Sequence, residues 1–370
     1  MRILIAPDKF AGTLGAVAAA EAMAAGWRRA CPAADIDLAP LSDGGPGFLD
    51  VLQTANGGRP VATTVSGPLG DRVPATVLLQ EGDAGVVAYI ESAQACGLDQ
   101  VAEARRDATL GTTYGVGELL ALAADFGAKR LVVGLGGSAT NDGGAGMLAA
   151  LGAQPASQLR RGGLALREVQ EVDLAPARAR MGGREIVAAT DVDNPLLGPY
   201  GASTVFGPQK GANLEQIEQL ESALGHWAES ADTARAKDEG AGAAGGLGYG
   251  LFLLGGHRES GIEAVLRELR LAERVGAADL VVTGEGSFDS QSLRGKVVSG
   301  LAHAATDHGV PCLVLAGRVA VRHEEMADAG VSAAYSLIDS AGSAEAAMAR
   351  TSEELAILAE RTAGAWADVR

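Results

Sequence analysis

The chain contains few of the residues that form disulfides or bind structural metal ions. Of its 370 residues only three are cysteine (Cys31, Cys96 and Cys312) and five are histidine. The cysteines lie far apart with no CxxC pair, which argues against a disulfide framework and a cysteine zinc site. No HExxH occurs, and His303 and His308 are five apart, off the spacing that shares a helix face. We therefore expect a fold held by its hydrophobic core in a reducing cytoplasm.

Positive charge, aromatic residues and long apolar runs are also scarce. Lys and Arg number 30 against 46 Asp and Glu, a formal net charge of −16, and aromatic residues make up 4%. Nucleic-acid partners are disfavoured, because their affinity comes from cations that neutralise phosphates. A small anionic substrate stays possible, since the local field decides its binding. No apolar run approaches the ~18 residues of a membrane span, and Met1–Asp8 is too short in its apolar part for a signal peptide.

Glycine, by contrast, is abundant, with 52 residues. Its most informative cluster is GLGGSATNDGGAGMLAALG, residues 134–152, preceded by the apolar run 131–133 and closed by the helix-like run 147–151. A strand, a glycine turn and a helix start bring backbone N–H groups close to an anion. The loop is expected to bind a negatively charged group through Gly136, Gly137, Ser138, Thr140, Asn141 and Asp142.

The rhythm of apolar runs predicts an α/β protein of two domains, the usual number for this length. Residues 2–6 and 36–38 resemble strands around a helix at 14–30, which predicts a parallel sheet. Residues 60–67, 72–80 and 85–91 have no helix between them and resemble an antiparallel meander. From 262 onward helices and strands alternate again. We expect a domain built from both chain ends, 1–60 plus 262–370, and an inserted mixed domain, 61–261.

Carboxylates and lysines follow the predicted strands. Ligands of open α/β sheets bind at the carboxyl ends of the strands, and Mg²⁺ takes one or two carboxylates together with phosphate oxygens. Asp191 and Asp193, two apart in extended chain, can face one ligand. The residues expected to hold metal, phosphate or substrate are Asp8, Lys9, Asp43, Gly44, Asp191, Asp193, Lys210, Glu285, Asp289 and Lys296.

Other interpretations remain open at this point. Turn formation and helix capping also account for Asp43, Asp142 and the Asp-Asn-Pro run at 193–195. Residues 134–139 approximate a dinucleotide-binding GxGxxG, but no acidic residue lies about 20 positions on to bind a ribose. The protein-kinase motifs are absent. A nicotinamide-dependent oxidoreductase and a non-catalytic binder of small acids are the alternatives to a phosphotransferase.

Taken together, the loops resemble the type I glycerate kinases, bacterial ATP-dependent enzymes that phosphorylate D-glycerate. The resemblance rests on segments in family order: Ala6-Pro7-Asp8 with Phe10 and Gly12-Thr13, Asp43-Gly44-Gly45, residues 136–146, residues 191–196, residues 206–212, residues 242–248, and Thr283-Gly284-Glu285-Gly286 with Asp289, Gln291, Gly295 and Lys296. Three positions depart from the usual pattern: Ala11 replaces a lysine, Pro46 an acidic residue and Ser287 a basic one.

The resemblance implies a Rossmann-like three-layer domain from both chain ends, an inserted mixed α/β domain, and an active site in the cleft between them. It implies transfer of the γ-phosphoryl group of ATP, with Mg²⁺, to a hydroxyl of D-glycerate. The expected product is 2-phosphoglycerate. The alternatives are 3-phosphoglycerate as the product, or another small hydroxy acid as the substrate. Asp191 is expected to act as base, with Asp193 and Lys210 beside it, and Asp191 and Asp289 as metal ligands. The protein is expected to be a monomer or homodimer.

Overall fold

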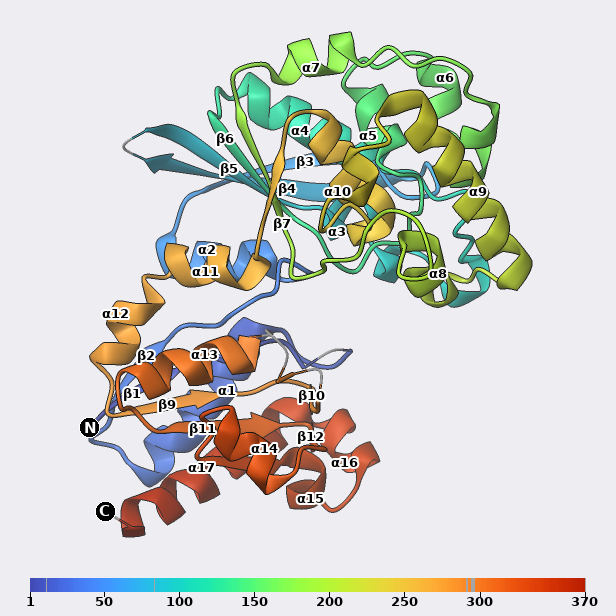
Figure 1. Ribbon diagram of the computed structural model, residues 1–370. Helices are drawn as coiled ribbons and strands as arrows, with labels where there is room; N and C mark the ends of the chain where they lie inside the picture. Colours follow the sequence, from blue (N-terminus) through green and yellow to red (C-terminus); the bar gives the residue numbers. More distant parts are fainter. Residues whose placement is uncertain (11, 83, 291, 294–296, 370) are drawn as a thin grey trace. The chain divides into compact units, whose positions relative to one another are not determined.

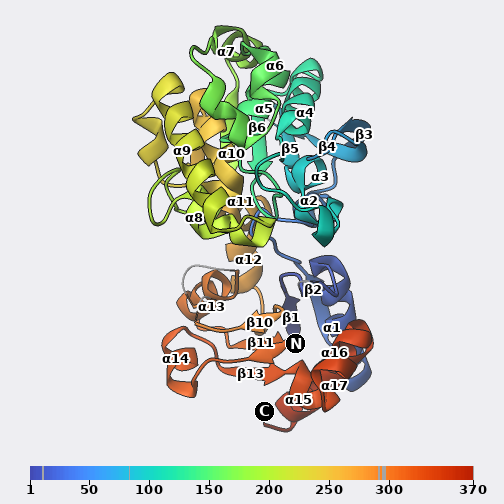
Figure 2. The same ribbon diagram turned by 90° about the vertical axis from the view of Figure 1, so that its right-hand side faces the viewer.

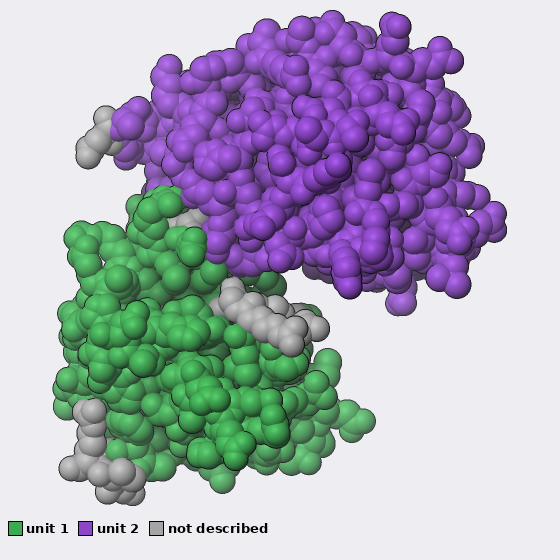
Figure 3. All heavy atoms as spheres, viewed as in Figure 1, with its two compact units in different colours: residues 1–43, 50–56, 262–370 green, residues 44–49, 57–261 purple. Residues whose placement is uncertain are grey.

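The computed structural model describes residues 1–370 except 11, 83, 291, 294–296 and 370, and it does not describe the side chains of 264 and 367–369. The chain divides into two compact units (Figure 3). Unit 1 comprises residues 1–43, 50–56 and 262–370, and unit 2 comprises residues 44–49 and 57–261. Both units are mixed helix and strand, so the expected α/β class is confirmed.

Unit 1 is a five-stranded parallel sheet in the order β13-β11-β9-β1-β2. A second, two-stranded pairing joins β10 to β12. The elements of this unit are β1 (Arg2–Ile5), α1 (Ala16–Ala30), β2 (Asp35–Leu38), α11 (Gly261–Glu268), α12 (Leu271–Gly276), β9 (Leu280–Thr283), β10 (Ser287–Phe288), α13 (Val297–Asp307), β11 (Cys312–Ala316), β12 (Arg318–Val319), α14 (His323–Asp328), β13 (Ala333–Ser336), α15 (Leu337–Ala341), α16 (Ala344–Ala349) and α17 (Thr351–Val369).

Alternating side chains of the unit 1 sheet serve its two faces. Ile3, Ile5 and their neighbours in β9 and β11 form one core with α1 and α17, while α13 covers the opposite face (Figures 1 and 2). The two chain ends meet here, because a side chain at Gly26 of α1 would lie 2.1 Å from the carbonyl oxygen of Ala356 in α17. Glycine at position 26 thus allows the first and last long helices of the unit to touch.

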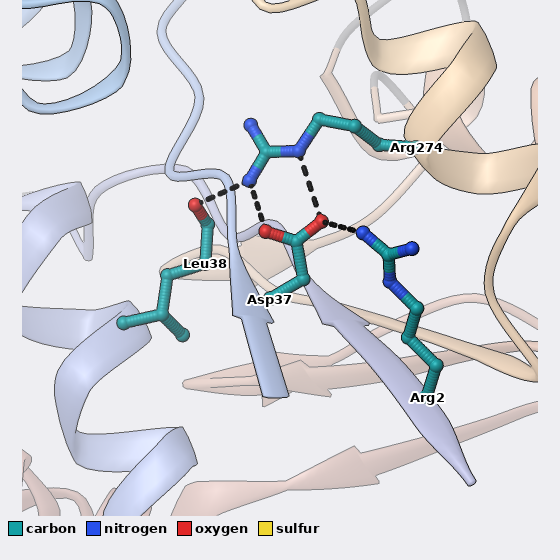
Figure 4. A network of polar contacts seen from close by, with 4 residues as sticks. All are labelled: Arg2, Asp37, Leu38 and Arg274. Atoms are coloured by element: carbon teal, nitrogen blue, oxygen red, sulfur yellow. Dashed lines mark hydrogen bonds and ion pairs between the residues drawn. The ribbon is translucent and has the colours of Figure 1, made fainter. Parts of the chain in front are cut away.

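A charged network ties the edge strand β2 to β1 and α12 (Figure 4). Arg274 donates to both carboxylate oxygens of Asp37, at 2.6 and 3.1 Å, and also to the carbonyl oxygen of Leu38 at 2.6 Å. Arg2 donates to the same carboxylate at 3.4 Å. The hydrogen bonds from Arg274, with the charge of both guanidinium groups, hold the pKa of Asp37 below its usual value.

Unit 2 is a six-stranded sheet in the order β3-β4-β5-β6-β7-β8, antiparallel from β3 to β5 and parallel from β5 to β8. The meander expected from the sequence is therefore confirmed. Its elements are β3 (Arg59–Ser66), β4 (Arg72–Gly82), β5 (Gly85–Glu91), α3 (Ala93–Cys96), α4 (Tyr114–Asp125), β6 (Arg130–Gly134), α5 (Ala145–Ala150), α6 (Ala156–Leu159), α7 (Ala175–Met181), β7 (Glu185–Ala189), α8 (Ala202–Phe206), α9 (Leu214–Ala231), α10 (Ala243–Leu253) and β8 (His257–Glu259), with five short 3₁₀ turns at Leu98–Gln100, Glu103–Arg105, Gly163–Glu168, Pro208–Lys210 and Arg235–Lys237.

The helix α2 (Phe48–Asn56) begins in unit 2 and continues in unit 1. The core of unit 2 packs α4, α5 and α10 on the sheet and closes over Trp227 of α9. No helix among the described residues is long and apolar enough to span a membrane.

Candidate functional site

The carboxyl ends of the parallel strands in unit 1 bring together several of the residues expected to be functional. The sheet order changes direction between β1 and β9, and such a switch point is where open α/β sheets bind ligands. The strands stay joined beyond their ends: the amide of Asp8 donates to the carbonyl of Gly284 at 2.8 Å, and the hydroxyl of Thr283 donates to that of Ala6 at 2.8 Å. Asp8 and the Glu285 loop are therefore adjacent at the switch point.

The chain after β2 adds a carboxylate and a lysine contact to this edge. The ammonium of Lys9 lies 3.0 Å from a carboxylate oxygen of Asp43, and both side chains remain partly exposed. Leu41 donates its amide to the carbonyl of Pro7 at 2.8 Å, which keeps the β2 loop beside the β1 loop. Asp289 follows the short strand β10, and its carboxylate accepts a hydrogen bond from Ser287 at 3.3 Å. We call Asp8, Lys9, Asp43, Glu285 and Asp289 the unit 1 edge.

Lys296, expected as a phosphate contact, lies outside the described residues, as do Ala11, Gln291 and Gly295. The departures Pro46 and Ser287 are described, in unit 2 and unit 1 respectively.

The carboxyl ends of β5, β6, β7 and β8 form the corresponding edge of unit 2. Asp191 follows β7, is half-buried, and accepts a hydrogen bond from the hydroxyl of Ser260 at 2.6 Å. Asp193, two residues on, is exposed. Glu91, the last residue of β5, accepts from the amides of Gly47 and Leu49 at 3.1 and 3.3 Å. We call Glu91, Asp191, Asp193 and Ser260 the unit 2 edge.

Gly44 acts in this edge through its backbone. A side chain there would lie 2.7 Å from the carbonyl oxygen of Ala189, and one at Gly136 would lie 2.7 Å from the Cα of Gly45. Gly44 also has a φ of 90°, which favours glycine. The Gly44-Gly45 pair thus rests directly on the ends of β6 and β7.

The polar side chains of the 134–146 loop point into unit 2. Thr140, Asn141 and Asp142 are fully buried and Ser138 is nearly so. Asp142 accepts four hydrogen bonds, from the amide and hydroxyl of Thr113 and from the amides of Gly144 and Gly146, at 2.8–3.2 Å. Burial raises the pKa of Asp142, and the donated hydrogen bonds oppose that rise. The Asn141 amide donates to Ser203 at 2.9 Å. These side chains hold the loop.

Lys210 belongs to the same buried cluster. Its side chain is 2% exposed, and its ammonium donates to the hydroxyl of Ser138 at 3.0 Å and to the carbonyl of Thr140 at 2.5 Å. Burial lowers the pKa of Lys210 to about 8, while the nearby Cys96 and Asp142 oppose that shift. Burial also raises the pKa of the Cys96 thiol to about 12. Lys210 therefore braces the loop from inside.

Two backbone amides of the loop remain candidates for anion binding. Gly136 and Gly137 donate no hydrogen bond to any residue that the structure describes, and Gly137 is exposed. The second glycine segment packs against the first: Gly143 donates to the carbonyl of Gly245 at 3.1 Å, and a side chain at Gly246 would lie 2.6 Å from the Cα of Gly143. Much of the glycine in both segments thus serves close backbone packing.

Sequence reasoning missed Glu91, Thr113, Ser203 and Ser260. Glu91 carried a usable signal, since it is an acidic residue at the end of the apolar run 85–90, like the other carboxylates that follow predicted strands. Ser260 carried none, because β8 is three residues long and was not expected.

The described residues contain one trio of groups close enough to share an ion, Glu185, His257 and Glu259, whose ligand atoms lie within 4.8 Å of one another. Arg130 already pairs with both carboxylates, at 3.0 and 2.8 Å, so a cation there would compete with a guanidinium.

Unit 1 has the topology of the open α/β proteins, which bind ligands at the carboxyl ends of the strands beside the switch point, and the unit 1 edge places carboxylates and a lysine there. A model of the glycerate kinase family matches residues 3–367. The glycerate kinase of Bacillus subtilis is 41% identical over 98% of this chain and 96% of its own, and the glycerate 2-kinase of Escherichia coli K12 is 40% identical over 94% and 93%. A crystal structure described as "putative glycerate kinase 2 from Salmonella typhimurium LT2" matches with a TM-score of 0.81 and 38% identity, covering 100% of this chain and 98% of that one.

The chain belongs to the glycerate kinase family. It is an enzyme, a kinase, which implies the use of ATP and a small-molecule substrate. The resemblance seen in the sequence is thereby confirmed, and neither an oxidoreductase nor a non-catalytic binder of acids is supported.

Proposed function

We propose that the protein transfers the γ-phosphoryl group of ATP to the 2-hydroxyl of D-glycerate, giving 2-phosphoglycerate. The observation that carries the proposal is Asp191, a half-buried carboxylate oriented by Ser260 at the end of β7. The 40% identity to a relative named glycerate 2-kinase supports the choice of hydroxyl. Phosphoryl transfer needs positioned charges and an acceptor for the hydroxyl proton, and a fixed carboxylate supplies the latter.

In this proposal Asp191 accepts the proton of the attacking hydroxyl, and Asp193 lies beside it as a second, exposed carboxylate. Lys9 supplies positive charge to a phosphate or to the glycerate carboxylate. Lys210 is a positioning residue, because its buried ammonium holds Ser138 and the carbonyl of Thr140. The amides of Gly136 and Gly137 are offered to an anion.

Magnesium fits the donor chemistry of the unit 1 edge. Asp8, Asp43, Glu285 and Asp289 are oxygen donors, and Mg²⁺ commonly binds through one or two carboxylates and completes its shell with phosphate oxygens and water. Asp289 remains our proposed metal ligand from this edge, and Asp191 is the other residue that we propose as a metal ligand. When bound, the ion would neutralise charge on the transferring phosphoryl group.

The decisive test is ³¹P NMR of the product formed by purified protein from D-glycerate, ATP and Mg²⁺. A 2-phosphoglycerate resonance supports the proposal. A 3-phosphoglycerate resonance would keep the kinase and overturn the position of attack, and no product from D-glycerate with turnover of another hydroxy acid would overturn the substrate. Treatment with EDTA is expected to abolish turnover, and added Mg²⁺ to restore it.

The role of Asp191 is tested separately with Asp191→Asn. We expect kcat to fall at least a hundredfold, in the range of lost general-base catalysis. Glu229→Gln, which removes one exposed carboxylate from α9 of the same unit, is the matched control. Near-full turnover by Asp191→Asn would refute the base assignment.

A further inference from the structure

Unit 2 contains a pocket that shares no residue with either edge or with the Lys210 cluster. Its volume is about 610 Å³, within the range of small-molecule sites. Four arginines line it: Arg105 and Arg106, the last residue of one 3₁₀ turn and the residue after it, and Arg160 and Arg161, the two residues after α6. In a chain with a net charge of −16, four guanidinium groups around one hollow are a marked local exception.

Two of these arginines lack an acidic partner. Arg105 and Arg161 form ion pairs with Asp71 and Glu168 at 3.7 and 2.8 Å, and all four of those side chains are largely exposed, where such pairs contribute little. Among the described residues, no carboxylate pairs with Arg106 or Arg160. The Arg106 Nε donates to the carbonyl of Val101 at 3.4 Å, and the guanidinium of Arg160 lies 4.9 Å from the centre of the Tyr114 ring.

The one acidic residue in the lining does not neutralise them. Asp107 accepts hydrogen bonds from the amide and the hydroxyl of Thr109, at 2.9 and 2.5 Å. No ion pair to any arginine involves its carboxylate within the part of the chain that the structure describes. Four guanidinium groups against one carboxylate give the pocket a net positive lining, which an anion would stabilise.

The remaining lining fits an anion with an organic body. Ser66 and Thr112 contribute hydroxyl groups, and Pro68, Leu69 and Leu110 contribute apolar surface. A volume of about 610 Å³ exceeds what a bare phosphate ion would fill. Guanidinium groups match phosphate geometry, because their N–H groups donate in a planar fork.

We propose that this pocket binds an organic phosphate, with Arg106 and Arg160 contacting the phosphate and the apolar side contacting the carbon skeleton. The site adjoins the buried loop cluster through one segment: Thr112 and Tyr114 line the pocket, and Thr113 between them donates twice to Asp142. The site goes beyond the proposed function, since it uses none of the residues assigned there.

The test is calorimetric titration of the full chain with three separate probes: ATP, 3-phosphoglycerate and inorganic phosphate. Arg106→Gln/Arg160→Gln is compared with wild type and with Arg59→Gln. Arg59 is a matched control, because it also lies over an aromatic ring, that of Phe126 at 5.0 Å, in the same unit. It begins β3, whose other end is Ser66, about 23 Å away along the strand.

We expect at least one organic phosphate to bind the double variant tenfold or more weakly than either wild type or Arg59→Gln. Hydrogen exchange should show protection of residues 104–114 when that probe binds the wild type. ATP and 3-phosphoglycerate distinguish a nucleotide from a phosphorylated acid. Equal affinities of all three proteins for both organic probes, or a loss confined to inorganic phosphate, would overturn the proposal.

These readouts do not depend on turnover. If the protein does not phosphorylate glycerate but binds an organic phosphate through Arg106 and Arg160, the proposed function is refuted and the proposed binding site is supported. If the protein phosphorylates glycerate but binds no organic phosphate through these arginines, the proposed function is supported and the proposed binding site is refuted. Thermal unfolding of the double variant confirms that it is folded before affinities are compared.

Discussion

The hydroxyl of Ser260 donates a hydrogen bond of 2.6 Å to the carboxylate of Asp191. The two residues are 69 positions apart in sequence, but they lie at the ends of two neighbouring parallel strands. Ser260 directly follows β8, and Asp191 is the second residue after β7. The bond ties the carboxylate that we propose as base to the loop after β8. Asp191 is therefore oriented by a residue that itself need not touch substrate.

Ser260→Ala should lower kcat about tenfold with little change in KM, because the base loses orientation while the binding groups stay in place. Steady-state kinetics at saturating ATP measure both values. Ser230→Ala is the control, since it removes a hydroxyl from α9 whose bonds are to the carbonyls of His226 and Val169. An unchanged kcat would show that Ser260 does not position Asp191 for reaction.

Lys210→Met should change how stability depends on pH. The pKa of Lys210 is lowered to about 8 in the folded protein, so the unfolded chain binds more protons between pH 8 and its ordinary value of 10.5. Wild-type stability should therefore rise by roughly 2 kcal/mol from pH 8 to pH 10 relative to the variant. Urea unfolding at both pH values measures this, with exposed Lys237→Met as control. If the stability of wild type and of Lys210→Met changed equally with pH, Lys210 would not have a lowered pKa in the folded protein.

Asp142→Asn should destabilise unit 2 by about 2–3 kcal/mol, because an amide nitrogen would face an N–H donor in place of a carboxylate oxygen. Thermal unfolding followed by circular dichroism measures the loss. Asp99→Asn, at an exposed position of the same unit, should leave the midpoint unchanged. Equal midpoints for the two variants would mean that the Asp142 hydrogen bonds contribute little.

Asp37→Asn should destabilise unit 1 by about 1–2 kcal/mol at neutral pH, since it weakens the pairing with Arg274. The folded pKa of Asp37 lies below 3.8, so its contribution is present above that value and is lost as pH falls further. The difference in unfolding free energy between wild type and variant should thus decrease below about pH 4. Denaturant unfolding at pH 7 and pH 3.5 measures it, with exposed Asp35→Asn as control; a gap that stays constant would contradict the mechanism.

The fold class followed from periodicity, because strand and helix patterns alternate wherever the sheet is parallel. The positions at which helices begin and end are less visible in the sequence. Residues 262–275 contain no glycine or proline, yet α11 ends at Glu268 and α12 begins at Leu271, with Arg270 between them at a φ of 48°. Nothing in the side chain of an arginine signals that conformation. Thr13 is of a residue type that often caps helices, but Gly15 is the cap of α1, and Thr13 donates to the carbonyl of Phe10.

The candidate site shows the same division. Motifs located the loops, because glycine and acidic residues at strand ends are visible in sequence. They did not show which way side chains point. Thr140, Asn141 and Asp142 are polar and lie beside glycine, as in an exposed ligand loop, yet tertiary packing turns them inward. The residues that orient them, Thr113 and Ser203, lie 29 and 62 positions away from their partners.

The meeting of α1 with α17 has a consequence for biosynthesis. Strand β1 is synthesised long before its neighbour β9, which begins at Leu280, and before α17, which begins at Thr351. At 5–20 residues per second, on the order of 10–60 seconds separate the synthesis of β1 from that of β9. Residues 57–261 are continuous and can fold during that interval. During that interval β1 can pair with β2 on one side, but its other edge stays unpaired until β9 has been made.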